Sequence, residues 1–141
     1  MSEFGWRILL VEDDEFDREL MFRALKNYGN LKVQLARDGE EATKIIGEGD
    51  EPKVRDWSGL PQLIFLDLKL PDGPADDVYD MAKEQQPECP IIIITGYPDS
   101  EMLNRILAKG PITVLKKPLK VEQLKDTVRI LGHKDAVKLA A

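Results

Sequence analysis

The sequence predicts an α/β domain in which a five-stranded parallel sheet carries helices on both faces. Five short apolar runs alternate along the chain with five stretches of helical periodicity, and this alternation is typical of parallel strands joined by helices. Four of the apolar runs are continuous, as expected of strands that are buried on both sides. A length of 141 residues fits one domain of ordinary size.

The strands are expected where the apolar runs stand. The second run, Leu31–Ala36, alternates between apolar and polar residues, which predicts an outer strand with one more exposed face. The other four runs are built mainly of Ile, Leu, Val and Phe and stop abruptly at polar residues. The expected strands cover residues 7–11, 31–36, 63–66, 90–94 and 112–115.

The helices are expected from apolar residues that recur on one face. In the first, that face runs from Phe16 to Leu25. Asp38 is a natural N-cap for the second helix, which Gly47 ends, and Leu107 is expected on the inner side of the fourth. The expected helices cover residues 16–25, 39–46, 75–86, 99–109 and 121–131.

The chain divides into one domain and a short tail. We assign residues 1–131 to the domain and residues 132–141 to a tail whose last four residues resemble a cloning remnant. Residues 48–60 form a long polar connection inside the domain, and Trp57 is expected to pack there over the edge of the core.

Composition favours a cytoplasmic protein. The single cysteine, Cys89, and single histidine, His133, exclude an intramolecular disulfide and a zinc site built from Cys and His. Apolar runs of about five residues fall far short of the roughly 20 that span a bilayer, and no signal-peptide pattern is present. We therefore expect a cytoplasmic location and no membrane partner.

The net charge of -6 is unevenly distributed. Residues 116–141 carry seven Lys or Arg and three Asp or Glu, whereas the rest of the chain carries 13 against 23. We interpret the basic segment as a solvated helix face, because cations suit the end of a helix. The acidic remainder repels DNA, so no nucleic-acid partner is expected.

Polar residues follow four of the five predicted strands. In an open α/β sheet, ligands bind beyond the carboxyl ends of the strands. A single Asp or Lys-Pro at such a place is usually a cap or turn, but four signals in consistent positions favour a functional site. The residues concerned are Glu12, Asp13 and Asp14 after the first strand, Asp67 after the third, Thr95 after the fourth and Lys117 after the fifth.

This set of residues suits phosphoryl transfer. Converging carboxylates repel one another unless a cation or a proton offsets their charge. Magnesium accepts carboxylate and carbonyl oxygens and retains several waters, which leaves room for a phosphoryl oxygen. A lysine ammonium and a threonine hydroxyl would then neutralise and hydrogen-bond the remaining phosphoryl oxygens.

Residues 6–131 resemble the receiver domain of bacterial two-component response regulators. The segment Ile8–Asp14 is similar to the family's acidic-pair segment, with Glu12 and Asp13 as the pair. The segments that carry the rest of the resemblance are Leu63–Gly73 around the phosphoacceptor, Ile94–Gly96 around the switch threonine, and Lys117–Pro118.

The resemblance implies a fold and a set of roles. The sheet is expected to be flavodoxin-like and doubly wound, with strand order 2-1-3-4-5 in a three-layer α/β/α arrangement, and the Lys117–Pro118 bond is expected to be cis. Asp67 would be the phosphoacceptor, with Thr95 and Lys117 binding the phosphoryl group. The ligands expected for magnesium are Glu12, Asp13, Asp67 and the backbone carbonyl of Lys69.

The implied function is signalling. A sensor histidine kinase or a phosphotransfer protein would supply the phosphoryl group, and the face formed by the fourth helix, fifth strand and fifth helix would transmit the change to an unknown output protein. Such a domain is not an enzyme beyond its own phosphorylation and dephosphorylation. Two alternatives stay open: a receiver fragment of a larger regulator or hybrid kinase, and a docking module that is not phosphorylated. A homodimer is also left open.

Three residues depart from the family's usual pattern or add to it. Val114 stands where the family often has Tyr or Phe, so we expect output to rely on the Thr95 loop and the fourth helix. Glu12 replaces the commoner Asp, and its greater length suggests contact with the metal through water. Tyr97 is hypothesised to shield the phosphoryl group from hydrolysis.

Two other functions of the same fold class fit less well. A flavodoxin-like or nucleotide-binding protein needs a glycine-rich phosphate loop after the first strand, where this chain has Glu12, Asp13 and Asp14. A phosphohydrolase resembling the haloacid dehalogenases has a second Asp two residues after the nucleophile, where this chain has Lys69.

Overall fold

The computed structural model describes residues 6–26, 28, 31–47, 60–71, 73–97, 100–110 and 113–131. Trp57 and His133 lie outside the described residues, as do all but one residue of the 48–60 connection and the whole of the 132–141 tail. The expected packing of Trp57 and the division of the chain at residue 131 therefore stay predictions.

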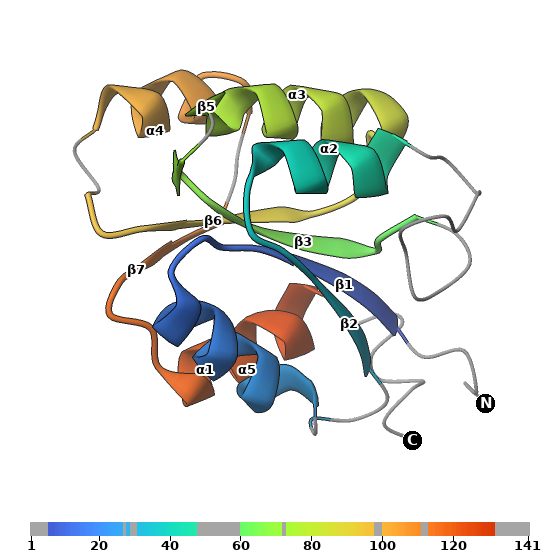
Figure 1. The fold of residues 1–141 in the computed structure, drawn as a ribbon, viewed down its shortest axis with the longest axis vertical. Coiled ribbons are helices and arrows are strands. Elements are labelled where there is room, and N and C mark those ends of the chain that lie inside the picture. The colour runs from blue at the N-terminus through green and yellow to red at the C-terminus, as the bar shows by residue number, and fades with distance from the viewer. Residues whose placement is uncertain are drawn as a thin grey trace.

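Five parallel strands form one sheet in the order β2-β1-β3-β6-β7 (Figure 1). This confirms the expected order 2-1-3-4-5, because β4 and β5 form a separate small hairpin. The strands of the main sheet are β1 (Trp6–Val11), β2 (Leu31–Ala36), β3 (Leu63–Asp67), β6 (Ile91–Thr95) and β7 (Thr113–Lys116).

Helices cover both faces of the sheet, as expected. In Figure 1, α1 and α5 lie on one face, and α2, α3 and α4 lie on the other. The expected three-layer arrangement is thereby confirmed. The helices are α1 (Glu15–Lys26), α2 (Gly39–Gly47), α3 (Ala75–Gln85), α4 (Glu101–Leu107) and α5 (Val121–Leu131).

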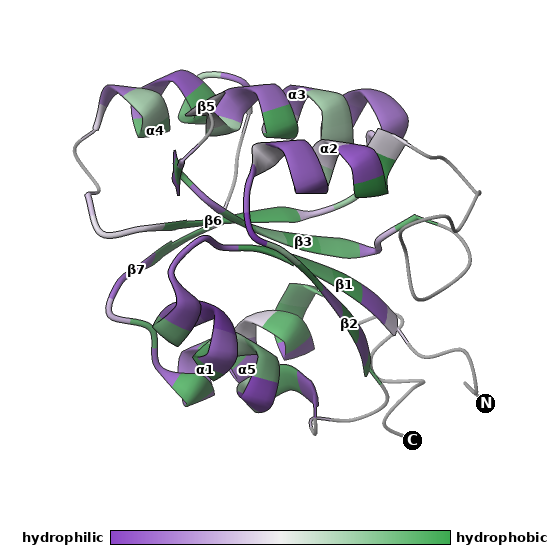
Figure 2. Ribbon diagram, viewed as in Figure 1, coloured by the Kyte–Doolittle hydropathy of each residue, from purple (hydrophilic) through white to green (hydrophobic). Residues whose placement is uncertain are grey.

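Alternate residues of the strands build two hydrophobic clusters, one on each face. In β1, Ile8 and Leu10 join the cluster beneath α1 and α5, whereas Leu9 and Val11 join the cluster beneath the other three helices. All four side chains are fully buried, and each such burial contributes roughly 1.5–3 kcal/mol. Figure 2 shows the same concentration of hydrophobic residues in the central strands. The sheet is therefore a rigid platform for the polar residues at the carboxyl ends of its strands.

Aspartate side chains cap the amino-terminal ends of two helices. The Asp38 side chain accepts a hydrogen bond of 2.8 Å from the backbone N–H of Glu41, which confirms it as the cap of α2. Asp14 caps α1 in a similar way, because its Oδ1 accepts from the N–H of Phe16 at 3.2 Å. These caps fix where each helix begins relative to the preceding strand.

The structure corrects three details of the sequence prediction. Phe16 and Leu107, expected on inner faces, are 74% and 41% exposed, respectively. Helix α4 is shorter than the expected 99–109, because the Ser100 hydroxyl accepts from the N–H of Leu103 and caps it there. Loop residues after Asp67 form a hairpin of β4 (Lys69–Leu70) and β5 (Gly73–Pro74).

No helix within the described ranges is long and apolar enough to cross a bilayer.

We predict that the Cys89 thiol is unreactive in the folded protein. Its side chain is buried, and desolvation raises the pKa of the thiol from 9.0 to about 12. At pH 8 the thiolate should be about 1,000-fold scarcer than in an exposed cysteine. Iodoacetamide should therefore modify Cys89 in urea but not in native buffer, as read by mass spectrometry. Rapid native alkylation would contradict the burial.

Candidate functional site

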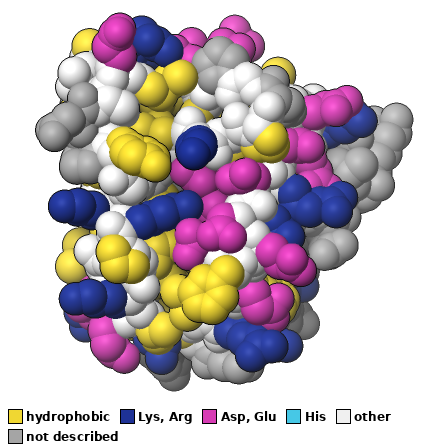
Figure 3. All heavy atoms as spheres, turned by 60° about the vertical axis from the view of Figure 1, so that its left-hand side comes forward, with side chains coloured by type: hydrophobic (Ala, Val, Ile, Leu, Met, Phe, Trp, Pro, Cys, Tyr) yellow, Lys and Arg dark blue, Asp and Glu magenta, His cyan; other side chains and the backbone are white. Residues whose placement is uncertain are grey.

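The polar residues predicted at the strand ends meet at one edge of the sheet. Glu12 follows β1, Asp67 is the last residue of β3, Thr95 is the last residue of β6, and Lys117 follows β7. Because these strands are parallel and adjacent, their carboxyl ends lie side by side. Figure 3 shows this edge, where acidic side chains gather in the middle and basic and hydrophobic side chains surround them.

Three carboxylates come together at the centre of this edge. Glu12, Asp13 and Asp67 each offer an oxygen, and these oxygens all lie within 4.8 Å of one another. Glu12 and Asp67 are buried, with 0% and 2% of their surface exposed, whereas Asp13 is exposed. The three form an acidic triad that is open to solvent on one side, an arrangement suited to a hard divalent cation.

Lys117 supplies the positive charge that faces these carboxylates. Its Nζ lies 3.1 Å from Glu12 and 3.2 Å from Oδ2 of Asp67. The third carboxylate in contact is that of Asp17, whose Oδ2 is 3.0 Å away. Partial burial lowers the pKa of Lys117, but the three carboxylates outweigh that effect and hold the pKa above its ordinary value. The side chain therefore stays an ammonium.

Glu12 is the most constrained of the carboxylates. Its Oε2 accepts hydrogen bonds of 3.1 Å from Lys117 Nζ and from the N–H of Asp14. Its Oε1 lies 3.1 Å from the same Nζ, but it is buried without a hydrogen bond of acceptable geometry. Burial, and then the neighbouring Asp67 carboxylate, raise the pKa of Glu12. A buried carboxylate oxygen without an aligned hydrogen bond is suited to act as a ligand for a second cation.

Asp67 is held by its own backbone surroundings. Its Oδ1 accepts a hydrogen bond of 3.0 Å from the N–H of Lys69, and the N–H of Leu68 donates to the carbonyl of Ile94 at 3.2 Å. The hairpin that starts at Lys69 thus begins directly at the acidic triad. The role expected for the Lys69 carbonyl as a metal ligand stays a prediction.

Thr95 and Tyr97 line the same cavity as Asp67, which has a volume of about 410 Å³. The Thr95 hydroxyl oxygen accepts from the N–H of Tyr97 at 2.9 Å, and the Thr95 carbonyl accepts from the N–H of Lys117 at 2.8 Å. The ring of Tyr97 is exposed, and the ammonium of Lys69 lies 5.7 Å from its centre. The bond between Lys117 and Pro118 is cis, as expected.

Val114 lies in β7, at the position where receiver domains often have Tyr or Phe. It is half-buried and packs against the hydrophobic cluster on the α2, α3 and α4 side of the sheet. Its neighbour across the ladder in β6 is Ile93. The Val114 side chain therefore contributes to the packing of the hydrophobic core.

Sequence reasoning did not identify Asp17 as a residue of the site. Asp17 precedes Leu20 by three residues and Met21 by four, so it shares the helix face that turns toward the sheet. The sequence signal that could have identified Asp17 is an acidic residue on the inner helix face, in the first helical turn after Glu12 and Asp13. The structure pairs it with Lys117, 100 residues further along the chain.

Comparison with known proteins places the chain in a family. The model of the response regulator receiver domain matches residues 8–129. The probable methanogenesis regulatory protein FilR2 of Methanothrix harundinacea is 31% identical over 132 residues, which cover 90% of this chain and 81% of that protein. A cyclic di-GMP phosphodiesterase of Thermotoga maritima is 29% identical over 118 residues, which cover 84% of this chain.

The relatives differ greatly in length. This chain spans 28% of the Thermotoga maritima protein and 53% of another relative. Among solved structures, a CheY-like response regulator receiver domain protein from Methanospirillum hungatei has the same fold. Its TM-score is 0.77, with 22% identity over 95% of this chain and 98% of that one. Because the family model covers most of the sequence, the chain belongs to the response regulator receiver domain family.

Proposed function

We propose that this chain accepts a phosphoryl group on Asp67 from a histidine kinase or a phosphotransfer protein. The observation that carries the proposal is the placement of the Asp67 carboxylate. It lies at the edge of the sheet, 3.2 Å from the Lys117 ammonium and close to two further carboxylates. A nucleophile that belongs to an acidic triad and also contacts an ammonium matches the requirements of metal-assisted phosphoryl transfer.

The proposed cofactor is Mg²⁺, held by Glu12, Asp13, Asp67 and the carbonyl of Lys69. The buried Oε1 of Glu12, which lacks a hydrogen bond, supports this assignment. Once bound, the cation would offset the carboxylate charge and neutralise the incoming phosphoryl oxygens. The Glu12 side chain is long enough either to bind the cation directly or to reach it through a water molecule.

In the proposed step, an Asp67 carboxylate oxygen attacks the phosphorus atom of a phosphohistidine. A P–O bond forms as the P–N bond breaks, and the electron pair of that bond stays with the imidazole nitrogen. Lys117 and Thr95 line the same cavity and would bind the transferred oxygens. The Thr95 hydroxyl would then donate to a phosphoryl oxygen, and the hydrogen bond that its oxygen accepts from the Tyr97 N–H would weaken.

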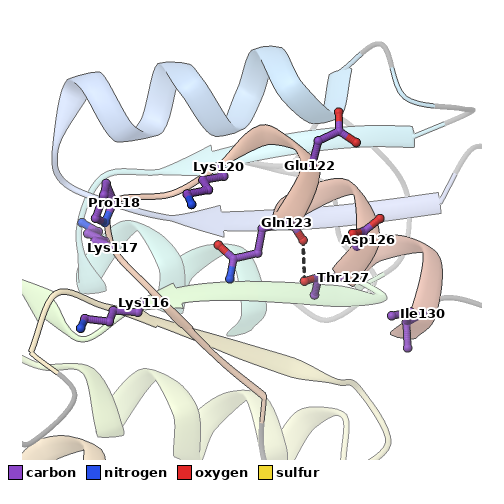
Figure 4. A pocket seen from close by; sticks show the side chains of 9 residues that line it. All are labelled: Lys116, Lys117, Pro118, Lys120, Glu122, Gln123, Asp126, Thr127 and Ile130. Carbon is purple, nitrogen blue, oxygen red and sulfur yellow. Dashed lines mark hydrogen bonds between the residues drawn. The ribbon is translucent and has the colours of Figure 1, made fainter.

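The proposed output face consists of α4, β7 and α5. A pocket of about 640 Å³ beside α5 supports this choice, because it includes Lys117 at one end and Ile130 at the other (Figure 4). Ile130 is 66% exposed and offers an apolar contact at that end of the pocket. Lys117 lines this pocket and contacts Asp67, so a change in its position on phosphorylation would reshape the pocket directly.

Partners and context are part of the same proposal. A sensor histidine kinase or phosphotransfer protein is the donor, and the output protein is not specified. The free, buried thiol of Cys89 is compatible with the cytoplasmic location expected from the sequence. Because the chain spans only part of several relatives, a role as the receiver unit of a larger regulator or hybrid kinase fits equally well.

The first test is direct phosphorylation. The protein is incubated with Mg²⁺ and either acetyl phosphate or phosphoramidate, and intact mass is followed. We expect one phosphoryl increment that hydroxylamine removes, because an acyl phosphate is labile to it. Asp67→Asn should abolish the increment, whereas Asp77→Asn, an exposed carboxylate on α3, should retain it. If the wild-type protein gains no phosphoryl increment with either donor, phosphorylation is refuted and the docking-module alternative is favoured.

A second prediction concerns pH and Mg²⁺. The surroundings raise the pKa of Glu12 from 4.5 to about 8, so between these values the folded, metal-free protein binds more protons than the unfolded chain. Its stability should therefore fall as pH rises through this range. Mg²⁺ requires the ionised carboxylate, so its affinity should rise over the same range.

The measurement is the thermal midpoint with and without Mg²⁺ at several pH values between about 5 and 8. Glu12→Gln removes the titrating group and should flatten both trends. Equal pH dependence in the wild type and this variant would show that other groups are responsible.

A third prediction concerns Tyr97, whose exposed ring lines the cavity beside Asp67. If the ring shields the phosphoryl group, Tyr97→Ala should raise the autodephosphorylation rate several-fold, because water reaches phosphorus more easily. Tyr97→Phe keeps the ring and should behave like the wild type. Decay of the phosphorylated mass over time gives the rates, and an unchanged rate in Tyr97→Ala would exclude shielding.

A further inference from the structure

Asp17 is one of three carboxylates that pair with Lys117 at similar distances. Its Oδ2 lies 3.0 Å from Nζ, and the corresponding distances are 3.1 Å for Glu12 and 3.2 Å for Asp67. The Asp17 side chain is only 16% exposed, so solvent screens this pair less than a surface pair. Asp17 is not one of the carboxylates whose oxygens gather within 4.8 Å as the acidic triad.

Hydrogen bonds made by neighbouring side chains hold the helical turn that carries Asp17 in place. On one side of it, Asp14 caps the helix by accepting from the N–H of Phe16. On the other side, Nη1 of Arg18 donates to the carbonyls of Glu12 and Asp13 at 3.1 and 3.2 Å. The first turn of α1 is thus fastened to the loop that carries the acidic pair. A carboxylate mounted on this turn has a fixed position relative to Asp67.

Lys117, in contrast, has a long flexible stem and an ammonium with three donors. Two of its three carboxylate partners, Glu12 and Asp67, belong to the triad that a cation would bind. A bound cation competes with the ammonium for these two. Asp17 is the partner outside that competition, so it is the one able to hold the ammonium beside Asp67 while the other donors turn to a phosphoryl oxygen.

We propose that Asp17 is a positioning residue, which holds the Lys117 ammonium beside Asp67 and thereby sets the rate of phosphoryl transfer. This inference rests on the proposed function. Without Asp17, the ammonium is left with Glu12 and Asp67 alone and is drawn toward the place that the cation needs. Productive contact between Lys117 and the phosphoryl group then becomes rarer, although every residue of the triad is unchanged.

The test compares phosphorylation rates of the full chain with phosphoramidate and saturating Mg²⁺. Asp17→Asn removes the charge and nearly preserves the shape, and we expect the rate to fall about tenfold. Glu15→Gln is the matched control, because it removes an exposed acidic charge from the same helical turn and should change the rate less than about twofold. Asp17→Glu should restore part of the rate.

A double-mutant cycle separates positioning from a general structural effect. In a Lys117→Met background, Asp17→Asn should no longer slow the residual labelling, which is followed over hours. Thermal midpoints of all variants show whether each is folded, and Asp17→Ser replaces Asp17→Asn if the latter is not.

Three results would overturn the inference while leaving the proposed function intact. They are a wild-type rate in Asp17→Asn, an equal loss in both Lys117 backgrounds, and an equal loss in Glu15→Gln. Failure of the proposed function looks different, because wild-type protein would then acquire no phosphoryl group at Asp67 under any donor. That result would overturn both.

Discussion

Three carboxylates, those of Glu12, Asp17 and Asp67, lie within 3.2 Å of a single nitrogen atom, Nζ of Lys117. Buried carboxylates this close repel one another strongly, and removal of their shared cation would leave uncompensated charge in a region of low dielectric. One ammonium does not balance three carboxylates together with the exposed Asp13. Burial first, and then the neighbouring Asp67 carboxylate, raise the pKa of Glu12, so that a proton can remove part of the excess negative charge. A divalent cation offers the same compensation without a proton.

The hydrophobic sheet makes this concentration of charge tolerable. β1, β3 and β6 are almost completely buried, and their ladder registers fix which residues end side by side. Asp67 is still part of β3, and its ladder partner in β6 is Ile94, next to Thr95. The stability of the domain therefore comes from the apolar layers, while its edge carries groups that oppose one another. Because of this division, the repulsion between carboxylates at the edge does not unfold the sheet, and a cation that binds there would relieve it.

The sequence predicted the strands and their terminal residues because continuous apolar runs are local signals that stop where the sheet stops. It predicted the strand order only through the resemblance to receiver domains. Phe16 was assigned wrongly, because helical periodicity cannot reveal that the first turn of α1 extends past the apolar layer, where Phe16 is 74% exposed. Asp17 was missed for a related reason, since its contact with Lys117 depends on how α1 packs against α5, the helix that follows Lys117. The β4–β5 hairpin has two residues in each strand and is too short to leave a periodic pattern.

Val114 is half-buried against the core, so under the proposed function a path from the site to α4 would use other groups, and the Thr95 loop contains a suitable set. The Thr95 hydroxyl accepts from the N–H of Tyr97, the Tyr97 carbonyl accepts from the N–H of Ser100, and the Ser100 hydroxyl caps α4 through Leu103. On the proposed function, a Thr95 hydroxyl that turns toward a phosphoryl oxygen weakens the first of these bonds. The other two bonds follow it along the chain, so under the same proposal the start of α4 would shift without rotation of an aromatic side chain. Because α4 is only seven residues long, its first turn makes up a large part of the helix. Loss of the amino-terminal cap would therefore destabilise the whole helix.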